Sequence, residues 1–264
     1  MLHNVDGCIQ FSNKVKMTTV LGVHLAPTNY MDATKRIIEH GYHLKNRYIC
    51  VANVHMLMEA YDAVSFRDLV NEADLVVPDG MPLVWVMRLK GEKGQQRVYG
   101  PSLMLRLLEA ASLENIPVGF YGGKPDVLDS LVEKMQAHYP NLNVAYSFSP
   151  RFGDITTDED AKIIEQINQS GAKILFVGLG CPKQEKWMAE HHGKIQAVML
   201  GVGAAFDFHA GAIPQAPVWM QKLGLEWLFR LMTEPRRLWK RYLYHNPRFI
   251  ILAIADLLGL LKTV

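Results

Sequence analysis

The segment Leu175-Phe176-Val177-Gly178-Leu179-Gly180-Cys181-Pro182-Lys183-Gln184-Glu185 passes from a short apolar run through two glycines into a helical pattern. Residues 76–80 and 198–207 also begin with apolar runs that stop at proline, aspartate or glycine. Such junctions are typical of an open parallel sheet, which presents its ligand loops at the carboxyl ends of its strands. We therefore expect the active site along that edge of the sheet.

Strand-like and helical patterns alternate along the chain. Runs rich in Val, Ile, Phe and Leu cover residues 48–54, 73–77, 117–121, 142–146, 173–178 and 196–201. Helical patterns cover residues 28–40, 81–90, 102–114, 125–138, 157–170 and 182–192. This alternation predicts an α/β fold, with a Rossmann-like, mostly parallel sheet and helices on both faces.

Length and composition suit one large domain with an appendage. The chain has 264 residues, 49% of them hydrophobic, which is ample for a core. We expect a leader over residues 1–18 without a secretory signal, a catalytic domain over 19–213 and a helical appendage over 214–264, with Pro214 and Pro217 at the boundary. The three cysteines form no CxxC motif, which favours a reducing, cytoplasmic setting.

Positive charge is concentrated in the C-terminal segment. From residue 220 onward there are eight Lys or Arg and three acids, whereas the whole chain has a net charge of only +2. Aromatic residues alternate with these cations, and an apolar run of about 13 residues follows, shorter than the roughly 20 needed to cross a bilayer. The pattern favours a peripheral membrane helix. A helix docked on the core and an interface between copies of the chain remain alternatives.

Asp79 is the first candidate catalytic residue. It directly follows a buried-looking strand, between Pro78 and Gly80, so it should project from the sheet edge on a tight turn. A carboxylate there can accept the proton of an attacking hydroxyl. The alternative is that Asp79 only forms the turn and caps the following helix.

The glycine-rich segments suit a diphosphate but match no nucleotide motif. Residues 178–180 and 201–203 lack the third glycine of the dinucleotide fingerprint, and residues 122–125 have proline where a Walker motif needs Ser or Thr. Backbone amides at helix N-termini can bind a diphosphate without such a motif. Helix-sheet packing is the competing explanation for these glycines.

Other polar residues stand at the same predicted edge. Gln184 opens a helix after Pro182, so its side chain should face the loops, and Asp207 could accept hydrogen bonds from a base or ribose. Arg97 could pair with a phosphate or with a surface acid. Residues 158–160 spell the D-x-D pattern of some metal-dependent sugar transferases, but capping after Thr156 explains them better. Cys181 is a weak nucleophile candidate.

Seven motifs together resemble the WecG/TagA/CpsF glycosyltransferases. The resemblance runs from about residue 21 to 247 and rests on Asn53 and residues 78–80, 97–100, 120–125, 178–185, 201–207 and 224–230. It implies a membrane-associated, inverting transferase that moves a sugar from a UDP-sugar to a polyprenyl-diphosphate-linked saccharide in bacterial surface-polymer synthesis. It further implies a peripheral location at the cytoplasmic face of the inner membrane.

The resemblance also assigns roles to individual residues. It makes Asp79 the base, with Asn53, Arg97 and Gln184 lining the site and Asp207 holding the uridine. Arginines of the appendage would lie over the active site. The expected substrate-binding set is Gly122, Gly123, Gly180, Lys183, Gln184, Gly203, Asp207, Arg230, Arg236, Arg237 and Arg241.

The family is regarded as metal-independent, and we expect no cofactor and no nucleic-acid partner. Some members have threonine where this chain has Val51, and N-acetylmannosamine, its uronic acid and glucose all remain candidate sugars. From the residues alone, two other functions stay open: a non-catalytic, membrane-docking nucleotide sensor and a nucleic-acid binder that uses the basic tail.

Overall fold

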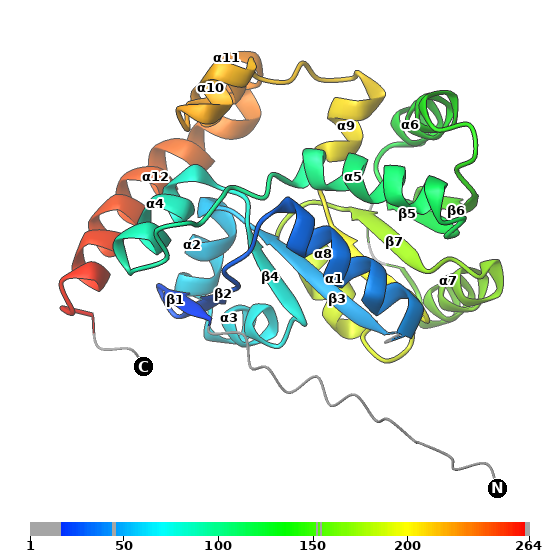
Figure 1. Cartoon of the computed structure of the whole chain (residues 1–264), viewed down its shortest axis with the longest axis horizontal. Helices are drawn as coiled ribbons and strands as arrows, with labels where there is room; N and C mark the ends of the chain where they lie inside the picture. The colour runs from blue at the N-terminus through cyan, green and yellow to red at the C-terminus, as the bar shows by residue number, and fades with distance from the viewer. Residues whose placement is uncertain (1–16, 44–45, 152, 154, 262–264) are drawn as a thin grey trace, which may run out of the picture.

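The computed structural model describes residues 17–43, 46–151, 153 and 155–261, so residues 1–16 of the expected leader lie outside the described part. Its centre is a six-stranded, all-parallel sheet with the order β4-β3-β8-β7-β5-β6 (Figure 1). The strands are β3 (Arg47–Ala52), β4 (Leu75–Pro78), β5 (Val118–Gly122), β6 (Val144–Phe148), β7 (Ile174–Gly178) and β8 (Val198–Gly201). All six predicted strands are present, and the predicted α/β class is confirmed.

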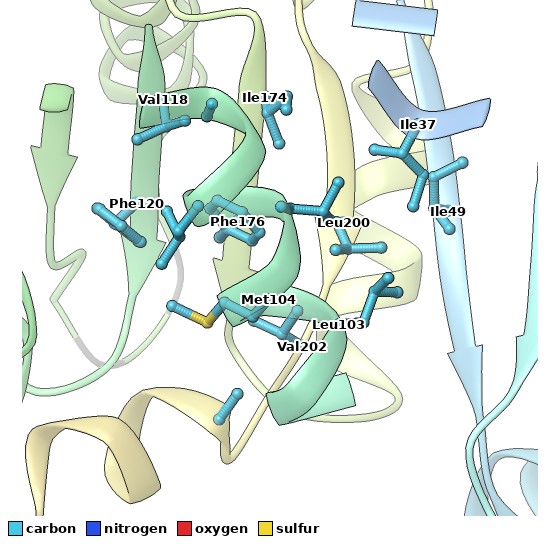
Figure 2. Close-up of a cluster of buried hydrophobic side chains, with 14 of the residues drawn as sticks. Ile37, Ile49, Leu103, Met104, Val118, Phe120, Ile174, Phe176, Leu200 and Val202 are labelled. Atoms are coloured by element: carbon cyan, nitrogen blue, oxygen red, sulfur yellow. The ribbon is translucent and has the colours of Figure 1, made fainter. Parts of the chain in front are cut away.

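Alternate strand residues point into two separate apolar layers. Ile49, Phe120, Phe176 and Leu200 belong to one layer, which Figure 2 shows beneath Leu103 and Met104 of a covering helix. Tyr48, Tyr121, Leu175 and Met199 belong to the other layer. Because both faces are covered, these strands are apolar throughout instead of alternating with polar residues.

Helices cover both faces of the sheet. The first layer is covered by α1 (Tyr30–His43), α5 (Gly100–Leu113), α6 (Pro125–His138) and α9 (Ala205–Ala210). The second is covered by α2 (Val54–Asp62), α3 (Val64–Asn71), α4 (Met81–Leu89), α7 (Thr157–Ser170) and α8 (Lys183–Glu190). The predicted helices over 125–138 and 157–170 match α6 and α7, while the others differ at their ends by a few residues.

The sequence patterns did not predict one hairpin and three helices that the structure contains. A hairpin of β1 (Thr18–Val20) and β2 (Val23–Leu25) turns through Leu21 and Gly22, both with positive φ. Its strands are too short for a recognisable alternation. Helices α2 and α3 were not predicted, and the expected strand over 48–54 ends at Ala52 because the Asn53 side chain caps α2 by accepting from the Met56 amide. The short helix α9 was also missed.

The appendage consists of α10 (Val218–Lys222), α11 (Glu226–Thr233) and α12 (Pro235–Leu257). Helix α12 lies against α2 and α4 (Figure 1), with Phe249 and Ala253 buried in the second core layer. Its Arg248 pairs with Asp62 at 2.7 Å, and its Asp256 pairs with Lys90, also at 2.7 Å. The alternative of a helix docked on the core is therefore correct for this face of α12.

The rest of the surface of α12, together with its C-cap, carries exposed apolar side chains, which we call the apolar face. It consists of Leu243, Tyr244, Ile250, Ile251, Ile254 and Leu258. None of the helices in the described part of the chain has both the length and the apolar composition needed to span a bilayer.

Candidate active site

Asp79 is the first residue after β4, at the edge of the sheet where the parallel strands end. The Asp79 amide donates to the Ala52 carbonyl at 2.8 Å, which ties this turn to the end of β3. The N-cap of α4 is Gly80, and no side chain caps that helix. The capping alternative for Asp79 is therefore wrong, and its carboxylate is available for another task.

The Asp79 carboxylate forms part of a partly buried ion network. Arg97 Nη2 lies 3.2 Å from Asp79 Oδ1 and 2.7 Å from Glu226 Oε2. The three side chains are only 14 to 16% exposed. The guanidinium also lies over the Tyr99 ring, 4.1 Å from its centroid. Arg97 thus pairs with a core carboxylate and an appendage carboxylate, and not with a surface acid.

This environment makes Asp79 a stronger base than an ordinary aspartate. Burial raises the pKa of Asp79 to about 6, and the negative charge of Glu226 adds to the rise. The Arg97 guanidinium and a hydrogen bond from the Gly100 amide act in the opposite direction. A carboxylate with a pKa near 6 is still ionised at pH 7 and is better matched to general-base catalysis.

A pocket of about 470 Å³ opens over this network, and we call it the Asp79 pocket. Asn53, Asp79, Arg97, Glu226, Arg230 and Arg241 contribute polar groups to its wall. Apolar side chains of α4, α11 and α12 also line it, among them Trp85, Val86, Trp227, Phe249, Ile250 and Ile254. The pocket therefore joins the candidate base to an apolar channel between core and appendage.

Two arginines of the Asp79 pocket have unpartnered groups. The Nε atoms of Arg230 and Arg241 are buried and have no hydrogen-bond partner among the described residues. Burial, together with the charges of Arg230 and Arg237, lowers the pKa of Arg241. Buried donors that are not satisfied within the protein are costly. An anionic ligand would satisfy both.

A second, larger pocket of about 1070 Å³ lies over β5, β7 and β8, and we call it the Gly180 pocket. Its wall includes Gly123, Gly180, Lys183, Gly203, Asp207 and Arg237 from the predicted set, together with Lys124. Helices α6 and α8 begin beside it, so their N-terminal amides add positive partial charge. Gly180 has φ +79°, and a Cβ at this position would have no atom within 4 Å, which leaves its backbone open to the pocket.

A chain of charges on the appendage links the two pockets. Arg230 Nη2 of the Asp79 pocket lies 3.9 Å from Glu234 Oε2, and Glu234 accepts from Arg237 Nε at 2.7 Å in the Gly180 pocket. Asp207 lies near these charges. Burial raises the pKa of Asp207, and the positive charge of Arg237 opposes the rise. The two pockets can therefore hold two ligands whose charged groups meet under α11 and α12.

Gln184 lies beneath the loops and not in either pocket. Its Oε1 accepts from the Gly180 amide at 3.1 Å, and its Nε2 donates to Glu185 Oε1 at 2.8 Å. A Cβ on Gly201 would lie 2.9 Å from Gln184 Nε2. The expected orientation of this side chain toward a nucleotide is not observed, because both the oxygen and the nitrogen of its amide form hydrogen bonds within the protein. Gln184 instead supports the glycine loops.

The structure also decides the roles expected of four further residues. Gly122 packs so closely against the Gly178 backbone that a Cβ on Gly122 would lie 2.7 Å from the Gly178 carbonyl carbon. Arg236 is exposed on α12. Neither residue lines the Asp79 pocket or the Gly180 pocket. Burial raises the pKa of the Cys181 thiol well above its usual value, which disfavours a nucleophilic thiolate. Val51 is 5% exposed in the core and offers no hydroxyl to a ligand.

The acidic cluster at residues 158–160 has a structural explanation. Thr156 and Glu159 form a capping box at the start of α7, and Asp160 pairs with His191 at 3.0 Å. A different group in the described part of the chain, His55, Glu59 and His245, has potential ligand atoms within 4.8 Å of one another. Burial lowers the pKa of His55 to about 3, and the nearby charge of Arg241 acts in the same direction. The absence of a metal remains a prediction.

Sequence reasoning missed two charged residues at the site. Glu226 lies within the motif at residues 224–230, and Lys124 within the motif at 120–125, but the sequence alone suggested a role for neither. Only the folding of the appendage onto the core brings Glu226 to Arg97. The position of Lys124 directly after two glycines at a strand end was a signal that could have been used.

Comparison with known proteins identifies the family. The model of the "Glycosyl transferase WecG/TagA/CpsF family" matches residues 18–263. The chain belongs to this family. A relative from Bacillus subtilis is 32% identical over 209 residues, 79% of each chain, and one from Bacillus spizizenii is 31% identical over 207 residues, 78% of each chain. Both are named N-acetylglucosaminyldiphosphoundecaprenol N-acetyl-beta-D-mannosaminyltransferase.

This family member is thus a glycosyltransferase, as the resemblance implied, and not a non-catalytic nucleotide sensor. The regions aligned with both relatives cover more than three quarters of the chain, so they include most of the sheet and its loops.

Proposed function

We propose that this glycosyltransferase moves N-acetylmannosamine from its UDP derivative to an N-acetylglucosamine that is linked by diphosphate to a polyprenyl lipid. The names of the two relatives support the choice of sugar and acceptor. The observation that carries the proposal is the Asp79 pocket, which combines a carboxylate base, two arginines whose buried Nε groups have no partner among the described residues, and an apolar wall.

The acceptor suits the Asp79 pocket because its parts match the pocket's parts. A saccharide hydroxyl would approach Asp79, the diphosphate would satisfy Arg230 and Arg241, and the first isoprene units would lie against Trp85 and Ile254. Guanidinium groups are well suited to phosphate because their donors form a planar fork. The lipid would continue toward the apolar face of α12.

The UDP-sugar suits the Gly180 pocket. Its diphosphate would lie near Lys124, Lys183 and the N-termini of α6 and α8, where amides and cations combine. Asp207 would accept hydrogen bonds from the uridine. The sugar would then extend toward the boundary between the pockets, where the appendage arginines lie.

The reaction in this arrangement is a single displacement. Asp79 takes the proton of the acceptor hydroxyl while that oxygen attacks the anomeric carbon, and the bond from this carbon to the UDP oxygen breaks. The configuration inverts, and UDP leaves with an additional negative charge. Arg230 and Arg237 would stabilise this charge. General-base assistance of this kind contributes about 10² to 10⁴ in rate.

The apolar face supports peripheral attachment to the membrane that carries the acceptor. Exposed aromatic and aliphatic side chains on α12 would enter the headgroup region, while the many Lys and Arg of this segment attract anionic lipid. We place this contact at the cytoplasmic face, where UDP-sugars are made. A second copy of the chain would be the competing occupant of this face.

Release of UDP tests the proposal. UDP-N-acetylmannosamine, UDP-N-acetylglucosamine and UDP-glucose are each incubated with a short-chain polyprenyl-diphosphate N-acetylglucosamine, and UDP is measured with and without the acceptor. We expect acceptor-dependent release from the first donor only. Release without acceptor, or none from any donor with acceptor present, would overturn the proposal. Acceptor-dependent release from another donor would overturn the choice of sugar.

A further inference from the structure

Glu226 is the one member of the Asp79–Arg97–Glu226 network that comes from the appendage. Asp79 and Arg97 belong to the core, whereas Glu226 is the first residue of α11. Its contact with Arg97, at 2.7 Å, is shorter than the 3.2 Å contact between Arg97 and Asp79, and both use the same Nη2 atom. The appendage carboxylate therefore competes with the base for one guanidinium.

The position of Arg97 is fixed by other contacts as well. Its Nε donates to the Asp79 carbonyl, and its guanidinium stacks on Tyr99. Without Glu226, the guanidinium would stay beside Asp79 and would pair with that carboxylate alone. A one-to-one ion pair stabilises the ionised carboxylate more than a guanidinium shared between two carboxylates does.

A close contact of the appendage with α4 holds Glu226 in place. Gly224 has φ +71°, and a Cβ at this position would lie 2.8 Å from the Trp85 ring and 3.2 Å from Met81. The turn that precedes α11 therefore rests directly on α4, next to the start of the helix. A Cβ at position 224 would be strained at this φ and would crowd both Trp85 and Met81, so we expect it to shift α11, and Glu226 with it, relative to Arg97.

We propose that Glu226 is a positioning residue that makes Asp79 a stronger base by sharing Arg97 with it, and that the base reaches full strength only when the appendage is docked. The inference rests on the proposed function of Asp79, but its electrostatic part holds whether or not the enzyme transfers the proposed sugar. The negative charge of Glu226 acts across a poorly solvated site, where it is weakly screened. Burial and this charge raise the pKa of Asp79 in the same direction.

The decisive experiment follows the Asp79 carboxyl directly by carbon NMR titration of the full chain, with Asp79→Asn to assign the signal. In Glu226→Gln, which removes the charge and keeps the size, we expect the titration midpoint to fall by about one pH unit. Glu226→Asp, which keeps the charge, should restore most of the shift. An unchanged midpoint in Glu226→Gln would overturn the inference.

The acid limb of the pH–rate profile gives the catalytic readout. For Glu226→Gln it should move to lower pH together with the midpoint, and kcat at its plateau should fall several-fold while the Kd for UDP stays the same. A lower kcat with an unmoved acid limb would show a merely structural role and contradict the inference. If the wild type transfers no sugar but the midpoint still shifts, the proposed function fails and the electrostatic inference stands.

Gly224→Ala tests the dependence on docking. Glu226 is intact in this variant, but the added Cβ meets Trp85. We expect the midpoint of Asp79 to fall as it does in Glu226→Gln. A midpoint equal to the wild-type value would overturn the link between docking and base strength.

Discussion

The core sheet and the appendage differ in how deeply their side chains are buried. Five of the six parallel strands are buried almost throughout, in two apolar layers. Helix α11 buries no residue within its described length, and α12 buries four of its 23. The core thus supplies fixed positions such as Asp79 and the glycine loops, whereas the appendage supplies charges that reach the site only by docking.

This difference assigns separate tasks to the two regions. The core positions the base, and the appendage brings the cations that would meet the leaving diphosphate. Polar links at both ends of the docked part of α12, Arg248 with Asp62 and Asp256 with Lys90, fix its register on the core. The following changes test each region in turn, starting with the largest effect.

The core carboxylate should have the largest effect on turnover. In Asp79→Asn, we expect kcat to fall at least a hundredfold because no group remains to take the proton of the acceptor hydroxyl. The Kd for UDP, measured by calorimetry, should stay the same. Asp158→Asn, at the exposed start of α7, is the matched control and should leave both values unchanged. Undiminished turnover in Asp79→Asn would remove this residue from the mechanism.

The appendage arginines should come next. Arg230→Gln and Arg241→Gln each remove a charged donor worth about 1.5 to 3 kcal/mol, so we expect kcat/KM to fall roughly ten- to a hundredfold. The neighbouring Arg236→Gln is the control because Arg236 is exposed and lines neither pocket. Equal losses in all three variants would mean that net charge matters and position does not.

The apolar face of α12 should control membrane binding and not chemistry. Replacing Ile251 and Leu258, each 67% exposed, with Glu should weaken sedimentation with anionic vesicles at least tenfold, because each apolar side chain loses about 1.5 to 3 kcal/mol of burial. Leu113→Glu, on the core, is the control. Unchanged vesicle binding would favour a second copy of the chain as the occupant of this face.

Glu185 tests the stability of the core beneath the glycine loops. It is fully buried, and this burial raises its pKa to about 7, above its ordinary value of 4.5. Because the folded state favours the protonated form, its stabilising contribution is full below about pH 4.5 and is lost as the pH rises through 7.

We expect Glu185→Gln, which stays neutral and can still accept from Gln184, to match the wild type at pH 5 and to exceed its Tm by a few degrees at pH 8. Thermal unfolding at both pH values measures this, with the exposed Glu165→Gln as control. A Tm difference that does not grow with pH would contradict the assigned pKa.

The strand-to-loop junctions could be predicted from the sequence because they depend on local patterns. Apolar runs located all six parallel strands, and the run that ends in Pro-Asp-Gly placed Asp79 at the correct edge. The capping box at Thr156 was equally local. The pattern made Asp79 a candidate base and Asp207 a candidate hydrogen-bond acceptor, and the family resemblance assigned them the specific roles of catalytic base and uridine contact.

The remaining features depend on tertiary contacts that no local pattern encodes. The contact between Glu226 and Arg97 joins residues 129 positions apart in the chain, and the burial of Gln184 under Gly201 depends on how two loops meet. Arg230, Arg236, Arg237 and Arg241 look alike in sequence. Only the helical rotation of α11 and α12 decides that Arg230 and Arg241 reach one pocket, Arg237 the other, and Arg236 neither.

The central claim is that fixed cations of the appendage, and no divalent ion, stabilise the departing diphosphate. The most direct measurement is sugar transfer by enzyme and substrates freed of metal with EDTA, before and after manganese is added. We predict an unchanged rate in EDTA, no increase with manganese, and no rescue of Arg237→Gln by manganese. Loss of transfer in EDTA that manganese restores would contradict the claim.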